Sequence, residues 1–367
     1  MSELIKDLYS EAFYEQFSSV LKQTIPSVNK DEFKNLIFID AFESYELKER
    51  LSHTTKVLNH FLPEDFKSAT QTIKELIENL NSANMREQSM EFMFIPEYIE
   101  IYGINDYENS VKAFEFITQF TSCEFAVRPF LKKYPDEMLS QMISWSKHEN
   151  NKVRRLASEG SRPRLPWAMA LPSYKNDPSP ILPILENLKE DSCEVVRRSV
   201  ANNLNDIAKD NPDTVIDISK QWKGKSKETD ALVKHACRTL LKQGELQILK
   251  LFGFGSQNFK VSGFNIITPQ VKIGDYLGFK FSIINQDDRA QLLRLEYGLY
   301  YMKNNGKLAR KVFKISEREI ESNKIYDIQR KQSFKIISTR KFHTGLHQVS
   351  IIVNGIEGEK LDFELTS

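Results

Sequence analysis

The sequence predicts an all-α repeat solenoid followed by a small all-β sandwich. Three observations indicate this fold class: helical amphipathic spacing over the first two-thirds of the chain, a tryptophan-centred unit that recurs within it, and a change to period-two alternation near residue 255. We therefore expect a helical domain over residues 1–254 and a sandwich over residues 255–367.

The first hundred residues have the spacing of amphipathic helices with acidic outer faces. Apolar side chains recur at helical intervals, as in Phe13, Phe17 and Leu21, and prolines interrupt the pattern at residues 26, 63 and 96. Because no cluster of chemically reactive side chains occurs there, we expect this segment to act as a scaffold.

From about residue 108 the chain repeats itself. Pro135 precedes Trp145 by ten residues, and Pro212 precedes Trp222 by the same interval. A charged loop follows each tryptophan, and a helix with a Val-Arg or Val-Lys pair follows each loop, with a further copy at Val196. Helix pairs that recur at roughly 40 residues are typical of a HEAT-like solenoid, in which both repeated tryptophans would lie in the core.

Stacked repeats would place the second helix of each pair along one concave face. The helix expected around Val196 and Val200 illustrates this arrangement: Asp191 and Glu194 predict a capping box at its start, and Asn211-Pro212 closes it. Helical spacing predicts a polar outer stripe on each second helix, made up of Glu124/Arg128, Arg155/Glu159/Arg162, Arg198/Asn202/Asp206 and Lys234/Arg238.

Residues 259–366 alternate at period two, as in the runs 277–283, 293–300 and 347–353. Turn signals at residues 286–288, 304–306, 343–345 and 354–355 separate these runs. About seven short strands in this length predict an immunoglobulin-like sandwich. The segment contains no cysteine, so its core must hold without a disulfide bond.

Composition limits the function classes. The net charge of +1 hides an asymmetry, because residues 1–150 hold 15 Lys and Arg against 25 Asp and Glu, whereas residues 151–367 hold 36 against 25. A polyanionic partner is therefore expected to bind the later part. No apolar run of about 18 residues predicts a membrane helix, and the start of the chain does not have the pattern of a signal peptide. Three scattered cysteines and six scattered histidines predict reduced thiols and no metal site.

The segments TSCEFAVRPF, VRRLASEGSRPRLPWA and VRRSVANNLNDIAKDNPD, in this order and spacing, resemble the AlkC family of DNA alkylation-repair glycosylases. The resemblance extends from about residue 5 to residue 253, and the closing sandwich is similar to the immunoglobulin-like domain of one branch. It implies a HEAT-like solenoid that binds duplex DNA and hydrolyses the N-glycosidic bond of cationic alkylated bases such as 3-methylcytosine and 3-methyladenine. The resemblance also implies that the base is not flipped into a pocket, which is the usual solution.

The resemblance implies that the active site contains Glu124, Glu159, Trp167 and Asp206. We expect Glu159 and Asp206 to flank the scissile bond, since a nearby carboxylate stabilises an oxocarbenium-like sugar, and Trp167 to pack on the sugar or the lesion. The cations expected to contact DNA phosphates are Arg155, Arg162, Arg164, Arg198, Lys234 and Arg238.

Alternatives remain open from the residues alone. Glu124 with Arg128, and Arg155 with Glu159, have the spacing of surface ion pairs, and the solenoid could be a non-catalytic HEAT-repeat scaffold that binds DNA or protein. We expect a monomer without a cofactor, in a bacterial cytoplasm and near the nucleoid when active. Basic groups at residues 303–314 and 331–341 of the sandwich predict a second contact with the DNA backbone.

Overall fold

A computed structural model of the chain describes residues 5–85, 90–337 and 340–367. By internal contacts the chain divides into a unit of Met1–Val215 with Trp222–Ala236 and a unit of Ile216–Gln221 with Cys237–Ser367. The change from helix to strand falls between Leu251 and Phe259, the segment that contains the predicted boundary at residue 254. Within the described ranges, no helix has both the length and the apolar character that a membrane span requires.

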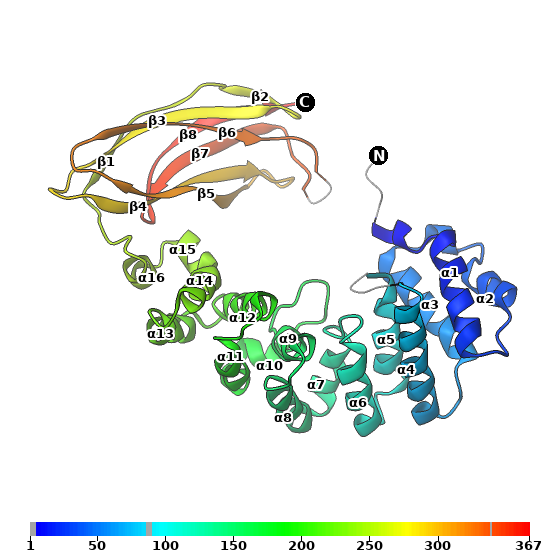
Figure 1. Cartoon of the computed structure of the whole chain (residues 1–367). Helices are drawn as coiled ribbons and strands as arrows, with labels where there is room; N and C mark the ends of the chain where they lie inside the picture. Colours follow the sequence, from blue (N-terminus) through cyan, green and yellow to red (C-terminus); the bar gives the residue numbers. More distant parts are fainter. Residues whose placement is uncertain (1–4, 86–89, 338–339) are drawn as a thin grey trace. The chain divides into compact units, whose positions relative to one another are not determined.

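The described helices follow one another in a regular series (Figure 1). They are η1 (Ile5–Leu8), α1 (Glu11–Thr24), α2 (Lys30–Ile37), η2 (Phe42–Ser44), α3 (Leu47–Phe61), α4 (Phe66–Ser82), η3 (Met90–Met93), α5 (Phe94–Tyr102), α6 (Tyr107–Ile117), α7 (Val127–Lys133), α8 (Pro135–Trp145), α9 (Asn151–Gly160), α10 (Pro172–Asn176), η4 (Ser179–Ile181), α11 (Leu182–Leu188), α12 (Glu194–Ile207), α13 (Pro212–Trp222), α14 (Lys227–Ala236), α15 (Arg238–Gln243) and α16 (Leu246–Leu251).

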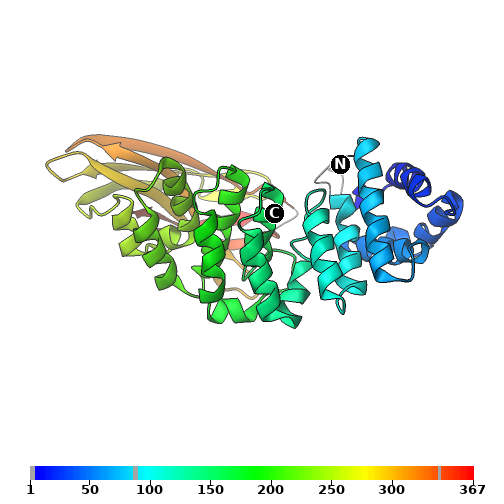
Figure 2. The ribbon, with the colours of Figure 1, turned by 60° about the horizontal axis from the view of Figure 1, so that its bottom comes forward.

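The predicted helical repeat is present in the first unit. Helices α9, α12 and α14 pack on one another in turn, and Figure 2 shows successive helices side by side in sequence order. Both α8 and α13 begin at a proline and end at a tryptophan, as the ten-residue interval predicts. Trp145 and Trp222 are only 1% and 3% exposed, and their indole N–H groups donate to Glu115 (2.7 Å) and Glu186 (2.9 Å). The predicted core position of both tryptophans is therefore confirmed.

The first arginine of each Val-Arg-Arg segment closes the loop that leads into its own helix. Arg154 donates to the carbonyls of His148 and Glu149, and Arg197 donates to the carbonyls of Asp191 and Ser192. The two contacts occupy equivalent places six and five residues upstream, so they are a structural feature of the repeat.

The predicted capping box at the start of α12 is wrong. Cys193 is the N-cap residue and its side chain makes no capping hydrogen bond. The carboxylate of Asp191 instead accepts the backbone N–H of Cys193 at 2.8 Å and the guanidinium of Arg154. Because Asp191 is engaged by these two donors, the entry to α12 is held by an ion pair with the preceding repeat.

The sandwich has two sheets in the described part of the chain. Its strands are β1 (Phe259–Ile266), β2 (Gln270–Lys272), β3 (Tyr276–Asn285), β4 (Gln291–Met302), β5 (Leu308–Ile320), β6 (Ile325–Ser333), β7 (Gly345–Val353) and β8 (Ile356–Thr366). One sheet has the order β1-β3-β6 and the other β2-β8-β7-β4-β5. Strand β2, which was not predicted, has only three residues and pairs parallel to β8. The buried cluster between the sheets is aliphatic and aromatic, as expected for a sandwich without a disulfide.

Candidate active site

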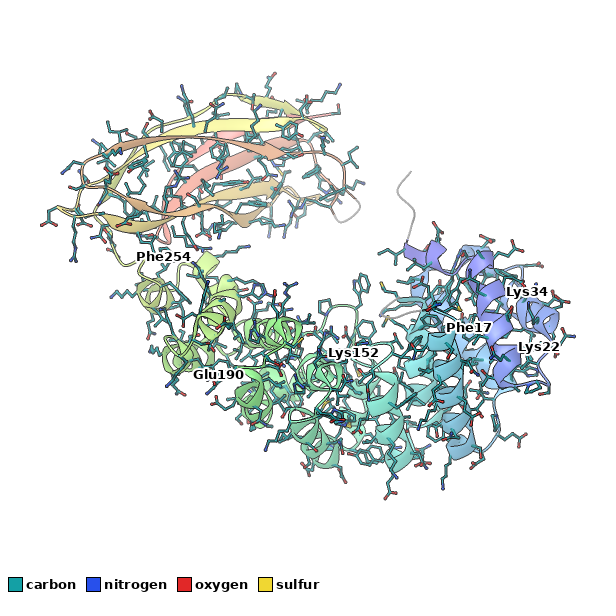
Figure 3. The ribbon with its side chains drawn as sticks, viewed as in Figure 1. Phe17, Lys22, Lys34, Lys152, Glu190 and Phe254 are labelled. Carbon is teal, nitrogen blue, oxygen red and sulfur yellow. The ribbon has the colours of Figure 1, made fainter. Side chains whose placement is uncertain are left out.

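A groove of about 670 Å³ lies in the helical unit where α9 and the start of α12 face the turn before α7. Five residues of the predicted site line it: Glu124, Arg155, Glu159, Arg162 and Trp167. We call it the Trp167 groove. Lys152, another of its lining residues, is labelled on α9 in Figure 3.

The guanidinium of Arg162 joins the two central carboxylates. Its Nη1 atom donates to Oε1 of Glu159 at 2.5 Å, and its Nε atom donates to Oδ2 of Asp206 at 2.8 Å. The three residues are between 2% and 7% exposed. Burial lowers the pKa of Arg162, but the carboxylates of Glu159 and Asp206 raise it more, so the net shift is upward. Glu159 and Asp206, 47 positions apart in sequence, therefore belong to one charged cluster.

The remaining carboxylate oxygens of this cluster have donors as well. Ser199 Oγ on α12 donates to Oε2 of Glu159 at 2.5 Å, and Lys209 Nζ donates to Oδ1 of Asp206 at 2.9 Å. Buried charged groups are tolerated when they are paired and hydrogen-bonded in this way. Both carboxylates are thus held in fixed orientations.

Glu124 forms a second ion pair at the edge of the groove. It lies in the turn before α7, and its Oε2 atom accepts from Arg155 Nη1 at 2.7 Å and from Ser122 Oγ at 2.6 Å. The alternatives in which Glu124 pairs with Arg128, and Glu159 with Arg155, are wrong. Helix α7 begins only at Val127, so Glu124 and Arg128 do not share a regular helical face.

Trp167 is presented to solvent by a loop of residues 161–171, which we call the Trp167 loop. Its side chain is 58% exposed, whereas its backbone has a φ of 66°, in the left-handed region that non-glycine residues rarely adopt. The ammonium of Lys48 donates to the Trp167 carbonyl at 2.5 Å. A strained, exposed aromatic residue beside buried charges is typical of a functional site.

Arg128 fixes this loop by hydrogen bonds to backbone carbonyls. The sequence did not predict this role. The residue is fully buried, and its guanidinium donates to the carbonyls of Gly160 (2.9 Å), Arg162 (2.8 Å) and Met169 (2.7 Å). Burial and the nearby charge of Arg162 lower the pKa of Arg128 to about 10, so it stays charged at neutral pH. The prediction that Arg128 points outward is therefore wrong.

Four predicted DNA-binding residues lie outside the Trp167 groove. Arg164 forms a bidentate pair with Asp210 (2.8 and 2.6 Å), and Arg198 pairs on the surface of α12 with Glu194 at 2.7 Å. Lys234 is half-buried on α14, and Arg238 begins α15 in the second unit. The site therefore does not gather all the predicted cations.

The outer stripe predicted for α12 is only partly correct. Arg198 is exposed, but Asp206 is buried beneath the Trp167 loop through its bond to Arg162. Asn203 of α12 donates to the carbonyl of Ser158 at 2.8 Å and so joins α12 to α9. In the described ranges no group of three or more His, Cys, Asp or Glu side chains is placed to hold a metal ion.

Comparison with known proteins fits this architecture. The family described as DNA alkylation repair enzyme matches residues 50–240, and the C-terminal Ig-like domain of the uncharacterised protein YhaZ matches residues 260–367. The chain is 39% identical to YhaZ of Bacillus subtilis (strain 168) over 362 residues, which cover 98% of this chain and 99% of that protein. The alkylpurine DNA glycosylase AlkC of Pseudomonas fluorescens, solved bound to DNA containing an abasic site analogue, superposes with a TM-score of 0.93 at 31% identity, over 100% of both chains.

The helical repeat, its groove and these similarities define a protein of DNA alkylation repair, and the chain belongs to the family of DNA alkylation repair enzymes. Within that family it has the architecture of AlkC, with a HEAT-like helical unit followed by an immunoglobulin-like domain.

Proposed function

We propose that this protein is a monofunctional DNA glycosylase that removes cationic alkylated bases, 3-methyladenine and 3-methylcytosine above all, from duplex DNA. The observation that carries the proposal is that Glu159 and Asp206 share the Arg162 guanidinium, and that Glu159 and Arg162 line the same groove as the exposed Trp167. The likeness of the whole chain to a DNA-bound alkylpurine glycosylase supports the same conclusion.

The chemistry needs little acid catalysis. A base that already carries a positive charge leaves with the electron pair of the N-glycosidic bond and becomes neutral, and positive charge then develops on the deoxyribose. A fixed carboxylate near the sugar stabilises that charge and orients the water that attacks the anomeric carbon. Glu159 lines the groove and takes this role, Asp206 acts beside it through Arg162, and Glu124 supports them from the edge of the groove.

The geometry favours a role for Arg162 other than contact with a phosphate. Its guanidinium donates to a carboxylate on either side, and the side chain is only 7% exposed. Arg162 would therefore hold the two carboxylates in one fixed alignment. Arg155, which lines the groove, and the more exposed Arg164 and Arg198 are better placed to meet phosphates, with Lys234 and Arg238 as further candidates.

Cleavage on this plan does not require the base to leave the helix before the bond breaks. The carboxylates act on the sugar, and a tryptophan face held at the surface packs against the sugar or the cationic lesion. We propose that excision proceeds without base flipping, on a monomer and without a cofactor.

The decisive experiment measures free base released from duplexes that carry 3-methyladenine, 3-methylcytosine or 7-methylguanine, with a chelator present. Glu159→Gln and Asp206→Asn each remove a charge with little change of shape. Each is expected to slow single-turnover excision about 100-fold or more, on the scale of other preorganised electrostatic groups, while the affinity for undamaged duplex is retained.

Glu190→Gln is the matched control. Glu190 is an exposed carboxylate in the turn after α11 that does not line the groove, and it is labelled in Figure 3. Its excision rate should equal that of the unmodified protein. If the unmodified protein binds these duplexes and releases no base, it is a non-catalytic scaffold and the proposal is wrong.

A further inference from the structure

A second, smaller cavity adjoins the Trp167 groove. It has a volume of about 180 Å³ and is bounded by α3, η3, α5 and the Trp167 loop. The cavity and the groove share part of their lining, namely Met90, Met93, Ser122, Phe125 and Trp167, so the two spaces are adjacent. Pockets for drug-sized ligands measure roughly 300–1,000 Å³, so this cavity suits a single small ring system and not a nucleotide.

The walls of the cavity are mostly apolar. Leu47 and Leu51 come from α3, Met93 and Pro96 from the η3–α5 segment, and Met169 from the Trp167 loop. Flat heterocycles bind well between such side chains because both of their faces are removed from water. The apolar walls therefore favour a planar ligand.

Two carboxyl groups on α5 supply polar contacts at one wall. Glu97 accepts the hydroxyl of Thr55 at 2.5 Å, whereas no hydrogen bond or ion pair engages the Glu100 side chain among the described residues. Burial and the charge of Glu97 raise the pKa of Glu100 to about 7, although Lys48 opposes the shift. The Glu100 carboxyl can therefore both donate and accept a hydrogen bond near neutral pH.

We propose that this cavity binds the methylated base after its excision, with the ring between apolar side chains and its amino and ring-nitrogen edge on Glu100. The inference rests on the proposed function, because only an excising protein generates a free base here. The position of the cavity suits this role, since Trp167 and Phe125 line both the cavity and the reaction groove. Binding of the freed base would delay its release and make it a product inhibitor.

The test is equilibrium binding of free 3-methyladenine to the full-length protein without DNA. Trp145 and Trp222 are buried, so quenching of tryptophan fluorescence by acrylamide reports mainly on Trp167. We expect the base to bind and to shield Trp167. Glu100→Leu, which removes the polar group at similar volume, and Leu51→Phe, which fills the cavity, should each weaken binding at least tenfold.

Glu64→Gln is the control, because Glu64 is an exposed carboxylate in the turn between α3 and α4 and does not line the cavity. Its affinity for the free base should match that of the unmodified protein. If the protein excises bases but does not bind free 3-methyladenine, or if Glu100→Leu and Leu51→Phe bind it normally, the cavity assignment is wrong. If the base binds as described and no base is excised from DNA, the cavity is a binding site for the free base but not a product site, and the proposed glycosylase activity fails.

Discussion

At the scale of single residues, the buried Arg128 determines where Trp167 lies. One carbonyl at the end of α9 and two in the Trp167 loop accept from one guanidinium, and each would be left without its donor if the arginine were removed. An unsatisfied buried carbonyl costs about 1–3 kcal/mol, so the loop would adopt another path. Arg128 touches no groove surface itself and is therefore a positioning residue.

We predict that Arg128→Met lowers the single-turnover excision rate at least tenfold and leaves the affinity for undamaged duplex within about threefold. Arg128→Lys keeps the charge but not the planar fork, so it should recover only part of the rate. Acrylamide quenching of the folded variants should change as Trp167 moves, which a loss of stability alone would not produce.

Lys48→Met provides a second variant that does not disturb the core, because Lys48 is exposed and donates to the carbonyl of Trp167. It should shift the quenching in the same direction with a smaller loss of rate. Normal excision and normal quenching in both Arg128→Met and Lys48→Met would contradict the positioning role.

Glu100 gives a residue-scale prediction about pH. Its folded pKa of about 7 lies above the usual value of 4.5, so the native state holds this proton more tightly than the unfolded chain does. Between these two values stability falls as the pH rises, and above about pH 7 the penalty is complete. The neighbouring charges are Glu97, whose pKa burial also raises, and Lys48, with Lys56 beyond them.

Glu100→Gln removes that penalty. We expect the variant to be more stable than the unmodified protein by about 3 kcal/mol at pH 8, and the difference to shrink toward zero as the pH falls to 5. Chemical denaturation followed through the transition of the helical unit measures this difference. The Glu64→Gln control should not differ in stability from the unmodified protein at either pH. If the stability difference between Glu100→Gln and the unmodified protein were the same at pH 5 and pH 8, titration of Glu100 would not be its cause.

At the scale of elements, the sequence predicted the helices and strands that a regular repeat or alternation of residues marks. The Pro-to-Trp interval located α8 and α13, and the period-two runs located β3, β4 and β7. The turn at Asn354 and Gly355, both of which have positive φ values, follows from the preference of Asn-Gly for tight hairpins. Strand β2 escaped prediction because three residues are too few to establish alternation.

The spacing of residues in the sequence could not predict the side-chain contacts between repeats. Val127-Arg128 resembles Val153-Arg154 and Val196-Arg197, and the valines are all buried. Yet Arg154 and Arg197 bind their own entry loops, whereas Arg128 crosses to a loop more than thirty positions ahead. Local rules describe partners three or four residues apart, so they assigned Arg128 to Glu124. The actual partners of Arg128 depend on the path of the Trp167 loop. That path includes Trp167 itself, whose positive φ no propensity scale predicts.

At the scale of the whole molecule, the role of the sandwich is best tested without removing it. Helices α15 and α16 belong to the same unit as the strands, and a Cβ on Gly355 would meet Leu249 of α16 at 2.8 Å. Deleting residues 256–367 would therefore expose the buried side chain of Leu249 to water. A truncated protein would report this damage together with any lost DNA contact.

Substitution of surface charges separates the two effects. Lys303 and Lys307 are exposed on the turn between β4 and β5, in the first basic group predicted to contact DNA. If both contact phosphates, the Lys303→Gln/Lys307→Gln variant should bind duplex more weakly, and the slope of log affinity against log salt should fall by roughly 2. Lys272→Gln/Lys280→Gln removes the same net charge from exposed positions elsewhere on the sandwich and should leave the slope within error. Equal slopes for both variants and the unmodified protein would show that the turn makes no contact with the DNA backbone.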